Sequence, residues 1–181
     1  MAWRNSAAEF GLVSRVLHWG MALGIMAMLA LGTTIADMEP GLANLWLYGL
    51  HKSMGLVLLA LVVARLIWHR ISPPPAPIGG GIAAVLAQAA HATLYVLMLA
   101  IPLAGWVASS ATGIDVMLFD RWVVPPIAPV SEAWERWGFI AHGLLTKALF
   151  ALVVVHALAA LKRAWTGDGT LRRMIFGRTK G

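Results

Sequence analysis

The stretch that decides the fold is GFIAHGLLTKALFALVVVHALAALK, residues 138–162. It contains no acidic residue and a single internal cation, Lys147. A helix needs about 20 predominantly apolar residues to cross a bilayer core of roughly 30 Å. The stretch therefore predicts a transmembrane helix, and two histidines, His142 and His156, lie within it.

Three earlier stretches have the same character, at about residues 13–36, 46–68 and 82–109. Residues 73–77 are all Pro or Ala, and residues 79–81 are all glycine. A turn is therefore expected between the second and third spans. Residues 110–137 hold acids and prolines and are expected to form one long loop. The sequence thus predicts an all-α fold, a transmembrane four-helix bundle that forms a single domain over residues 1–181.

Composition supports a membrane protein. Hydrophobic residues make up 60% of the chain and charged residues 12%, whereas a soluble domain has about half and a quarter. The absence of cysteine excludes thiolate metal sites and iron–sulfur ligation. The net charge of +6 comes from residues beside the spans, which indicates a lipid membrane as partner and argues against nucleic acid.

The basic residues also predict the orientation. Ten Lys and Arg residues lie on the side that carries both termini, and four lie on the other side: Lys52, Arg121, Arg136 and Lys147. Because cytoplasmic loops carry the excess of Lys and Arg, both termini are expected in the cytoplasm.

The two histidines of the stretch 138–162 are the strongest functional signal. Fourteen residues at about 100° each return the chain to within about 40° of its starting direction, about 21 Å further along the helix. His51 lies at the depth of His142, and His18 at the depth of His156. Haem iron takes imidazole as an axial ligand, and two imidazoles leave no open position. The pattern favours two haem b sites for electron transfer, one from His18 and His156 and one from His51 and His142.

Several residues near the histidines fit a haem, which is a flat macrocycle with charged propionates at its edge. Arg15 precedes His18 by three residues and Lys52 follows His51, so each is a candidate partner for a haem propionate or for lipid. Glycines near the histidines would allow a bulky group to approach the backbone, although small residues in membrane helices also serve packing: Gly20, Gly24, Gly55 and Gly143. His69 adjoins Arg70 at the interface and is expected to be solvated or bound to headgroups.

His91 complicates the assignment. It lies in the third span at the depth of His18 and His156, so three imidazoles compete for two axial positions. We assign the iron to His18 and His156. His91 then contacts a propionate or a quinone, or displaces His18 as ligand; spacing does not distinguish these alternatives.

At these residues the chain resembles the bacterial cytochrome b561 family, small dihaem b-type cytochromes of the inner membrane. The similarity covers nearly the whole chain, and order and topology agree as well as the motifs. The matching segments are RVLHW (15–19), LHKSMG (50–55), HATLY (91–95), PLAGW (102–106), HG (142–143), HALAALK (156–162) and DGTLRRM (168–174).

The resemblance implies a multi-pass protein of the bacterial inner (cytoplasmic) membrane with the four haem ligands already named. It also implies exchange of electrons with ubiquinone and, in the best-known member type, oxidation of superoxide on the outer side. Lys52 would then attract the superoxide anion as part of the catalytic site. Acids on the outer side oppose a broad attraction of anions, which leaves the donor open.

Two other readings remain. The chain is alternatively a cytochrome b subunit that carries electrons between a hydrogenase or dehydrogenase partner and quinone, with the loop 110–137 or the basic tail as docking surface. From a different class, it is a haemless transporter or helix-packing protein, which a missing Soret band would reveal.

Overall fold

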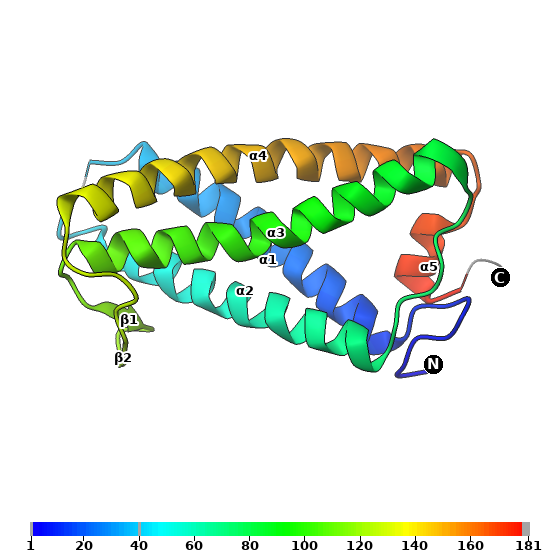
Figure 1. Ribbon diagram of the computed structural model, residues 1–181, viewed down its shortest axis with the longest axis horizontal. Coiled ribbons are helices and arrows are strands. Elements are labelled where there is room, and N and C mark those ends of the chain that lie inside the picture. Colours follow the sequence, from blue (N-terminus) through cyan, green and yellow to red (C-terminus); the bar gives the residue numbers. More distant parts are fainter. Residues whose placement is uncertain (1, 40, 179–181) are drawn as a thin grey trace.

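The computed structural model describes residues 2–39 and 41–178. Four long helices dominate it (Figure 1), and each is long and apolar enough to cross a membrane. The elements in chain order are α1 (Leu12–Ala36), α2 (Leu45–Ile71), α3 (Gly81–Ala111), β1 (Val116–Leu118), β2 (Trp122–Val124), α4 (Glu132–Trp165) and α5 (Thr170–Phe176). The four predicted spans are confirmed, with ends that differ by a few residues.

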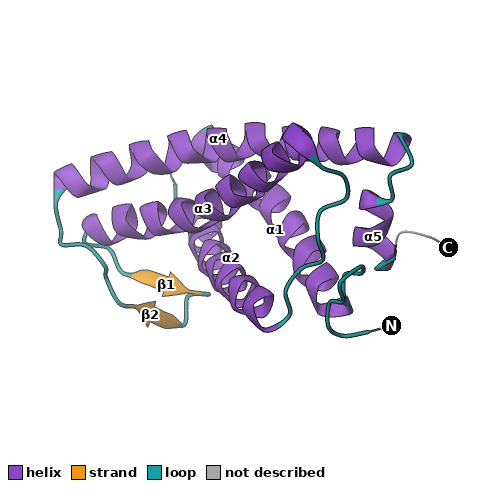
Figure 2. Cartoon of the chain, turned by 45° about the vertical axis from the view of Figure 1, so that its right-hand side comes forward, coloured by secondary structure: helices purple, strands orange, loops and turns teal. Residues whose placement is uncertain are grey.

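The helices run lengthwise through the molecule, and the start of α1 and the short helix α5 lie at the same end (Figures 1 and 2). We call this the terminal end. The strands β1 and β2 lie at the opposite end, which we call the hairpin end. An even number of spans returns the chain to the end at which it began.

The helices pack unequally. Helix α4 lies against α3, where a Cβ on Gly138 would come within 2.8 Å of the Ala108 Cβ. Helix α1 lies against α2, and the Trp68 indole donates a hydrogen bond to the Ser14 hydroxyl at 2.9 Å. Within the described residues, the backbones of α1 and α2 hardly approach that of α4. A separation therefore exists between α4 and the two helices that face it.

Helix α4 begins six residues earlier than residue 138, the predicted start. The Ser131 hydroxyl accepts the Trp134 N–H, and Glu132 and Glu135 occupy the first turn, where acids are favourable. At 34 residues the helix is about 51 Å long, so it extends past a bilayer core of roughly 30 Å. Residues 132–137, expected in the loop, belong to this extension, whereas Asp115 and Asp120 lie outside it.

A β-hairpin interrupts the segment expected to be only a loop, so the all-α prediction is incomplete. Val116 pairs with Val124 in antiparallel register, and Phe119 and Asp120 form the turn with positive φ. The Ser53 hydroxyl accepts the Phe119 N–H at 2.8 Å, which attaches the hairpin to α2. The strands are short and their turn contains no glycine, so the usual hairpin signals are missing from these residues.

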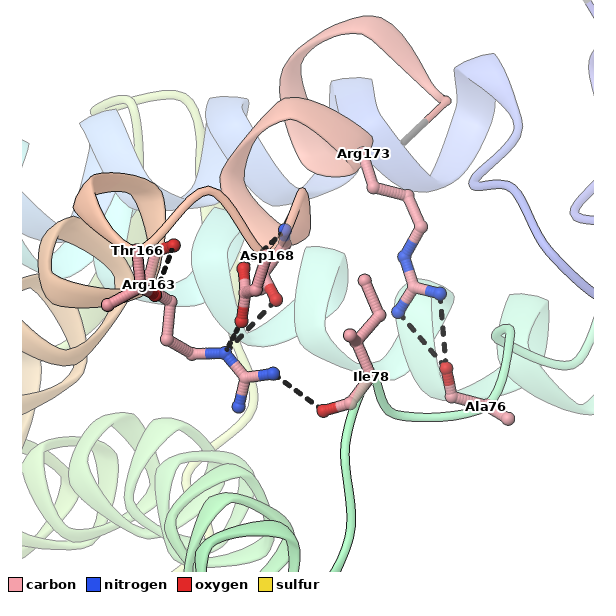
Figure 3. A network of polar contacts seen from close by, with 7 residues as sticks. Ala76, Ile78, Arg163, Thr166, Asp168 and Arg173 are labelled. Carbon is pink, nitrogen blue, oxygen red and sulfur yellow. Dashed lines mark hydrogen bonds and ion pairs between the residues drawn. The ribbon is translucent and has the colours of Figure 1, made fainter. Parts of the chain in front are cut away.

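Helix α5 closes the terminal end through a network of polar contacts (Figure 3). The Arg163 guanidinium pairs with Asp168 and donates to the Ile78 carbonyl at 2.6 Å. Asp168 also accepts the Thr170 N–H at 2.8 Å, at the start of α5. Arg173 donates to the Ala76 carbonyl from both terminal nitrogens at 3.1 Å. The network joins α4, α5 and the turn after α2.

Asp168 gives this network a pH dependence. Burial raises the pKa of the Asp168 carboxyl, but the hydrogen bonds from Thr170 and the Arg163 guanidinium outweigh burial and lower that pKa below its ordinary value. The folded pKa is depressed, so the stabilisation is complete above about pH 4, the range of an unfolded Asp, and is lost as pH falls through the folded pKa.

We therefore expect Asp168→Asn to destabilise α5 by about 1 kcal/mol at pH 7. Hydrogen exchange of the α5 amides measures this local opening, and the difference from the unmodified chain should shrink toward pH 3. Asp37→Asn, an exposed position outside the network, serves as control. Equal exchange of the two proteins at pH 7 would contradict the prediction.

Candidate functional site

Two histidines face each other at the hairpin end. His51 of α2 and His142 of α4 have ring centroids 6.0 Å apart, with their planes at 73°. These are the residues that the sequence pairs at this depth. They meet across the separation between α2 and α4, so neither helix fills the space between them by close backbone packing.

The spacing of the rings can be compared with that of two ligands on one metal. A metal–imidazole bond is about 2 Å long, and the ring centroid lies about 1 Å beyond the bound nitrogen. Two imidazoles on opposite sides of one metal ion therefore have centroids about 6 Å apart. The hairpin-end pair has this spacing.

A backbone contact orients the ring of His142. Its Nδ1 donates to the Ile101 carbonyl of α3 at 2.9 Å, which places the proton on Nδ1 and leaves Nε2 free as a metal ligand. Gly105 makes this contact possible. A Cβ at position 105 would lie 3.0 Å from Nδ1 and 3.2 Å from Cε1 of His142. Neither Ile101 nor Gly105 was expected to contact the site from its position in the sequence.

His51 lies against a glycine in a similar way. A Cβ on Gly32 of α1 would lie 3.3 Å from the His51 Cε1. Within the described part of the chain the His51 Nδ1 is buried without a hydrogen-bond partner. Each histidine of this pair is thus bordered by a glycine on a helix that does not carry the other histidine.

Three histidines meet nearer the terminal end. The ring centroids of His18 and His156 are 6.3 Å apart, which matches two ligands of one metal. Those of His91 and His156 are 5.3 Å apart, too close for such an arrangement, and the His91 side chain is exposed. The structure brings all three together, as the sequence suggests, and the spacing favours His18 and His156 as the ligand pair.

A buried arginine that the sequence analysis did not select adjoins this group. The Arg65 side chain of α2 is 9% exposed, and its Nη2 lies 3.4 Å from the His18 Nδ1. Its Nε donates to the Tyr95 hydroxyl at 2.9 Å, and that hydroxyl lies 3.2 Å from the His69 Nδ1. His69, which was expected to be solvated or bound to headgroups, is half-buried against Tyr95. An arginine inside an apolar span is itself a signal of function.

The predicted propionate partners lie at the two ends of the bundle. Arg15 is 7% exposed and its Nη1 donates to the Ile175 carbonyl of α5 at 2.8 Å. Lys52 is half-buried at the hairpin end, one residue after His51. Arg15 therefore contributes to the closure of the terminal end, and contact of either cation with a propionate stays a prediction.

The glycines near the histidines differ in their surroundings. A Cβ at Gly24 would lie 2.9 Å from the Leu58 side chain, so this glycine serves the packing of α1 on α2. Nothing lies within 4 Å of such a Cβ at Gly20 or Gly143. Both glycines are exposed, so the open space beside them is the outside of the bundle and gives no support to a role in holding a macrocycle.

The residues present fit haem better than a metal ion alone. Across residues 2–39 and 41–178, no group of three His, Asp or Glu side chains is placed to hold a metal. Paired imidazoles provide two axial donors, and a porphyrin provides the four equatorial nitrogens that the protein lacks there. The helix separation, the ring spacing and the proton on the His142 Nδ1 all suit this division of ligands.

Four membrane-spanning helices with paired imidazoles at two levels are the features of multi-pass membrane cytochromes of the b type. Comparison with known proteins gives the family. The profile described as Prokaryotic cytochrome b561 matches residues 9–177. Cytochrome b561 homolog 2 of Escherichia coli (strain K12) is 31% identical in an alignment 181 residues long. The alignment covers 97% of this chain and 95% of that protein. The chain belongs to the prokaryotic cytochrome b561 family: it is a multi-pass membrane haem protein that transfers electrons across the membrane.

Proposed function

We propose that the chain binds two haems b and transfers electrons from a one-electron donor at the hairpin end to a quinone. One haem is held by His51 and His142, the other by His18 and His156. The observation that carries the proposal is the spacing of these two pairs, 6.0 and 6.3 Å between ring centroids, at two levels of the bundle.

Each haem would supply a centre that accepts and releases one electron. The chain's own residues orient and separate these centres. With two imidazoles at each site, a bound haem would have no position left for dioxygen, and the Ile101 carbonyl keeps the proton of His142 on Nδ1, so that Nε2 could hold iron. Arg15, Lys52 and His91 are candidates to bind propionates or the quinone. The excess of Lys and Arg on the terminal side supports an orientation with both termini in the cytoplasm.

Superoxide is the donor we propose and ubiquinone the acceptor. Two superoxide ions release two electrons and become two molecules of dioxygen, while one ubiquinone takes two electrons and two protons to become ubiquinol. Lys52 supplies a cation beside His51, where it attracts the anionic donor. Asp120 lies over the first turns of α2, where a Cβ on Gly49 would be 3.1 Å from its Oδ1, and it opposes this attraction.

Rapid mixing of the purified dihaem protein with superoxide tests the donor. We expect fast reduction of the haem, slowed about threefold to tenfold in Lys52→Gln with a weaker dependence on ionic strength. Arg136→Gln removes the same charge from an exposed position near the start of α4 and should have little effect. Reduction by dithionite without reduction by superoxide would reject superoxide and leave the haem sites standing.

A second candidate is a cytochrome b subunit of a hydrogenase or dehydrogenase. The hairpin end favours it, because apolar side chains are exposed there outside the helices: Ile114, Trp122, Val123, Ile127 and Val130. A redox partner that co-purifies and is lost in Trp122→Ser would support this candidate. Superoxide oxidation at full rate by the isolated chain would argue against it.

A further inference from the structure

Arg65 is a buried positive charge without a carboxylate beside it. It lies within α2, and its contacts are the Tyr95 hydroxyl and ring and the His18 Nδ1. Within the described part of the chain the single ion pair joins Arg163 to Asp168. Arginine stays protonated throughout the usable pH range, so this charge is permanent.

A fixed cation at this position acts on any metal bound to His18. The iron site gains one unit of positive charge when it is oxidised, and a nearby cation disfavours that state, strongly where water is excluded. If Nε2 of His18 held iron, Nδ1 would carry the proton and could not accept the hydrogen bond that Arg65 can donate to it at 3.4 Å in this structure, so only the nearby charge of Arg65 would act on the site. The imidazole of His18 therefore gains no basicity from this contact, and Arg65 favours reduced iron.

The hairpin-end site has the opposite surroundings. His142 donates from Nδ1 to the Ile101 carbonyl, and this contact raises the basicity of the imidazole and favours oxidised iron. No arginine contact to His51 or His142 is present among the described residues. Lys52 follows His51 and is half-buried, whereas the Arg65 guanidinium lies directly against a ring nitrogen of His18.

We propose that Arg65 holds the haem of the terminal end at a higher reduction potential than the haem of the hairpin end. Electrons then move spontaneously from the hairpin end to the terminal end. This inference rests on the two haem sites proposed above, and it assigns Arg65 as a positioning charge that sets the direction of transfer.

The test is an optical potentiometric measurement on the purified full-length dihaem protein. Arg65→Gln should lower the higher of the two midpoint potentials by at least the equivalent of a tenfold change in the reduction equilibrium, which is 59 mV for one electron. Arg65→Lys should restore most of the shift. Arg70→Gln, an exposed cation of the same helix, should change neither potential.

A single-haem variant assigns the potentials. His51→Ala should retain the higher potential, and Arg65→Gln should lower it in that background as well. The inference is overturned if Arg65→Gln shifts neither potential, shifts only the lower one, or if His51→Ala retains the lower one. Haem content separates this failure from failure of the proposed function, because fewer than two haems in the unmodified chain would reject the sites themselves.

Discussion

Replacing His18 by alanine is expected to reduce the haem content from two to one per chain, whereas replacing His91 leaves two. The reason is the ring spacing: His18 lies 6.3 Å from His156, as two ligands of one metal do, and His91 lies closer than such a pair allows. Haem quantification by the pyridine haemochrome method measures the change.

The same measurement separates the alternatives. His69→Ala is the matched control, because His69 belongs to the neighbouring contact with Tyr95 and to neither pair. Retention of two haems in His18→Ala with loss of one in His91→Ala would exchange the roles of these residues. Absence of a Soret band from the unmodified chain, despite ample haem supply, would instead select the haemless reading.

Gly105→Val is expected to remove the haem of the hairpin end and leave the other in place. A Cβ at this position would meet the His142 ring at 3.0 Å, and the branched side chain occupies more of that space. The ring must turn, so it loses the Ile101 carbonyl and with it the alignment of Nε2. The expected haem content is one per chain, and Gly105→Ala should keep two haems with an altered spectrum.

Two controls restrict this interpretation to the site. Ala89→Val introduces the same side chain at an exposed position of α3 and should leave two haems. Adding Gly105→Val to His142→Ala should not lower the haem content further, because the valine acts on the His142 ring and that ring is already absent. A normal spectrum and two haems in Gly105→Val would refute the argument.

Much of the fold follows from the sequence because lipid imposes strict demands on each span. Apolar length defines the four helices, and their even number puts both termini at one end. The hairpin, the early start of α4 and helix α5 lie outside the apolar segments. There the backbone conformation depends on a serine cap, a left-handed turn or a carboxylate such as Asp168. Such residues are hard to recognise in the sequence, because their effect depends on the groups that they contact in the fold.

The part of the site that the sequence predicts best is the pair of histidines carried by one helix, α4. The step from His142 to His156 gives both depth and direction, and the partners follow from depth. The same fourteen-residue step separates His51 from Arg65 on α2, so the sequence also held the signal for Arg65. Gly105 and the Ile101 carbonyl were not predictable, because their roles depend on where α3 passes α4.

Helix α4 carries one ligand of each proposed pair and continues without proline from Glu132 to Trp165. The distance over which an electron must tunnel between the two centres is therefore fixed by a single rigid segment. The rate of transfer between the centres should consequently be insensitive to the thickness and fluidity of the surrounding lipid, unlike the exchange of quinone with the bilayer.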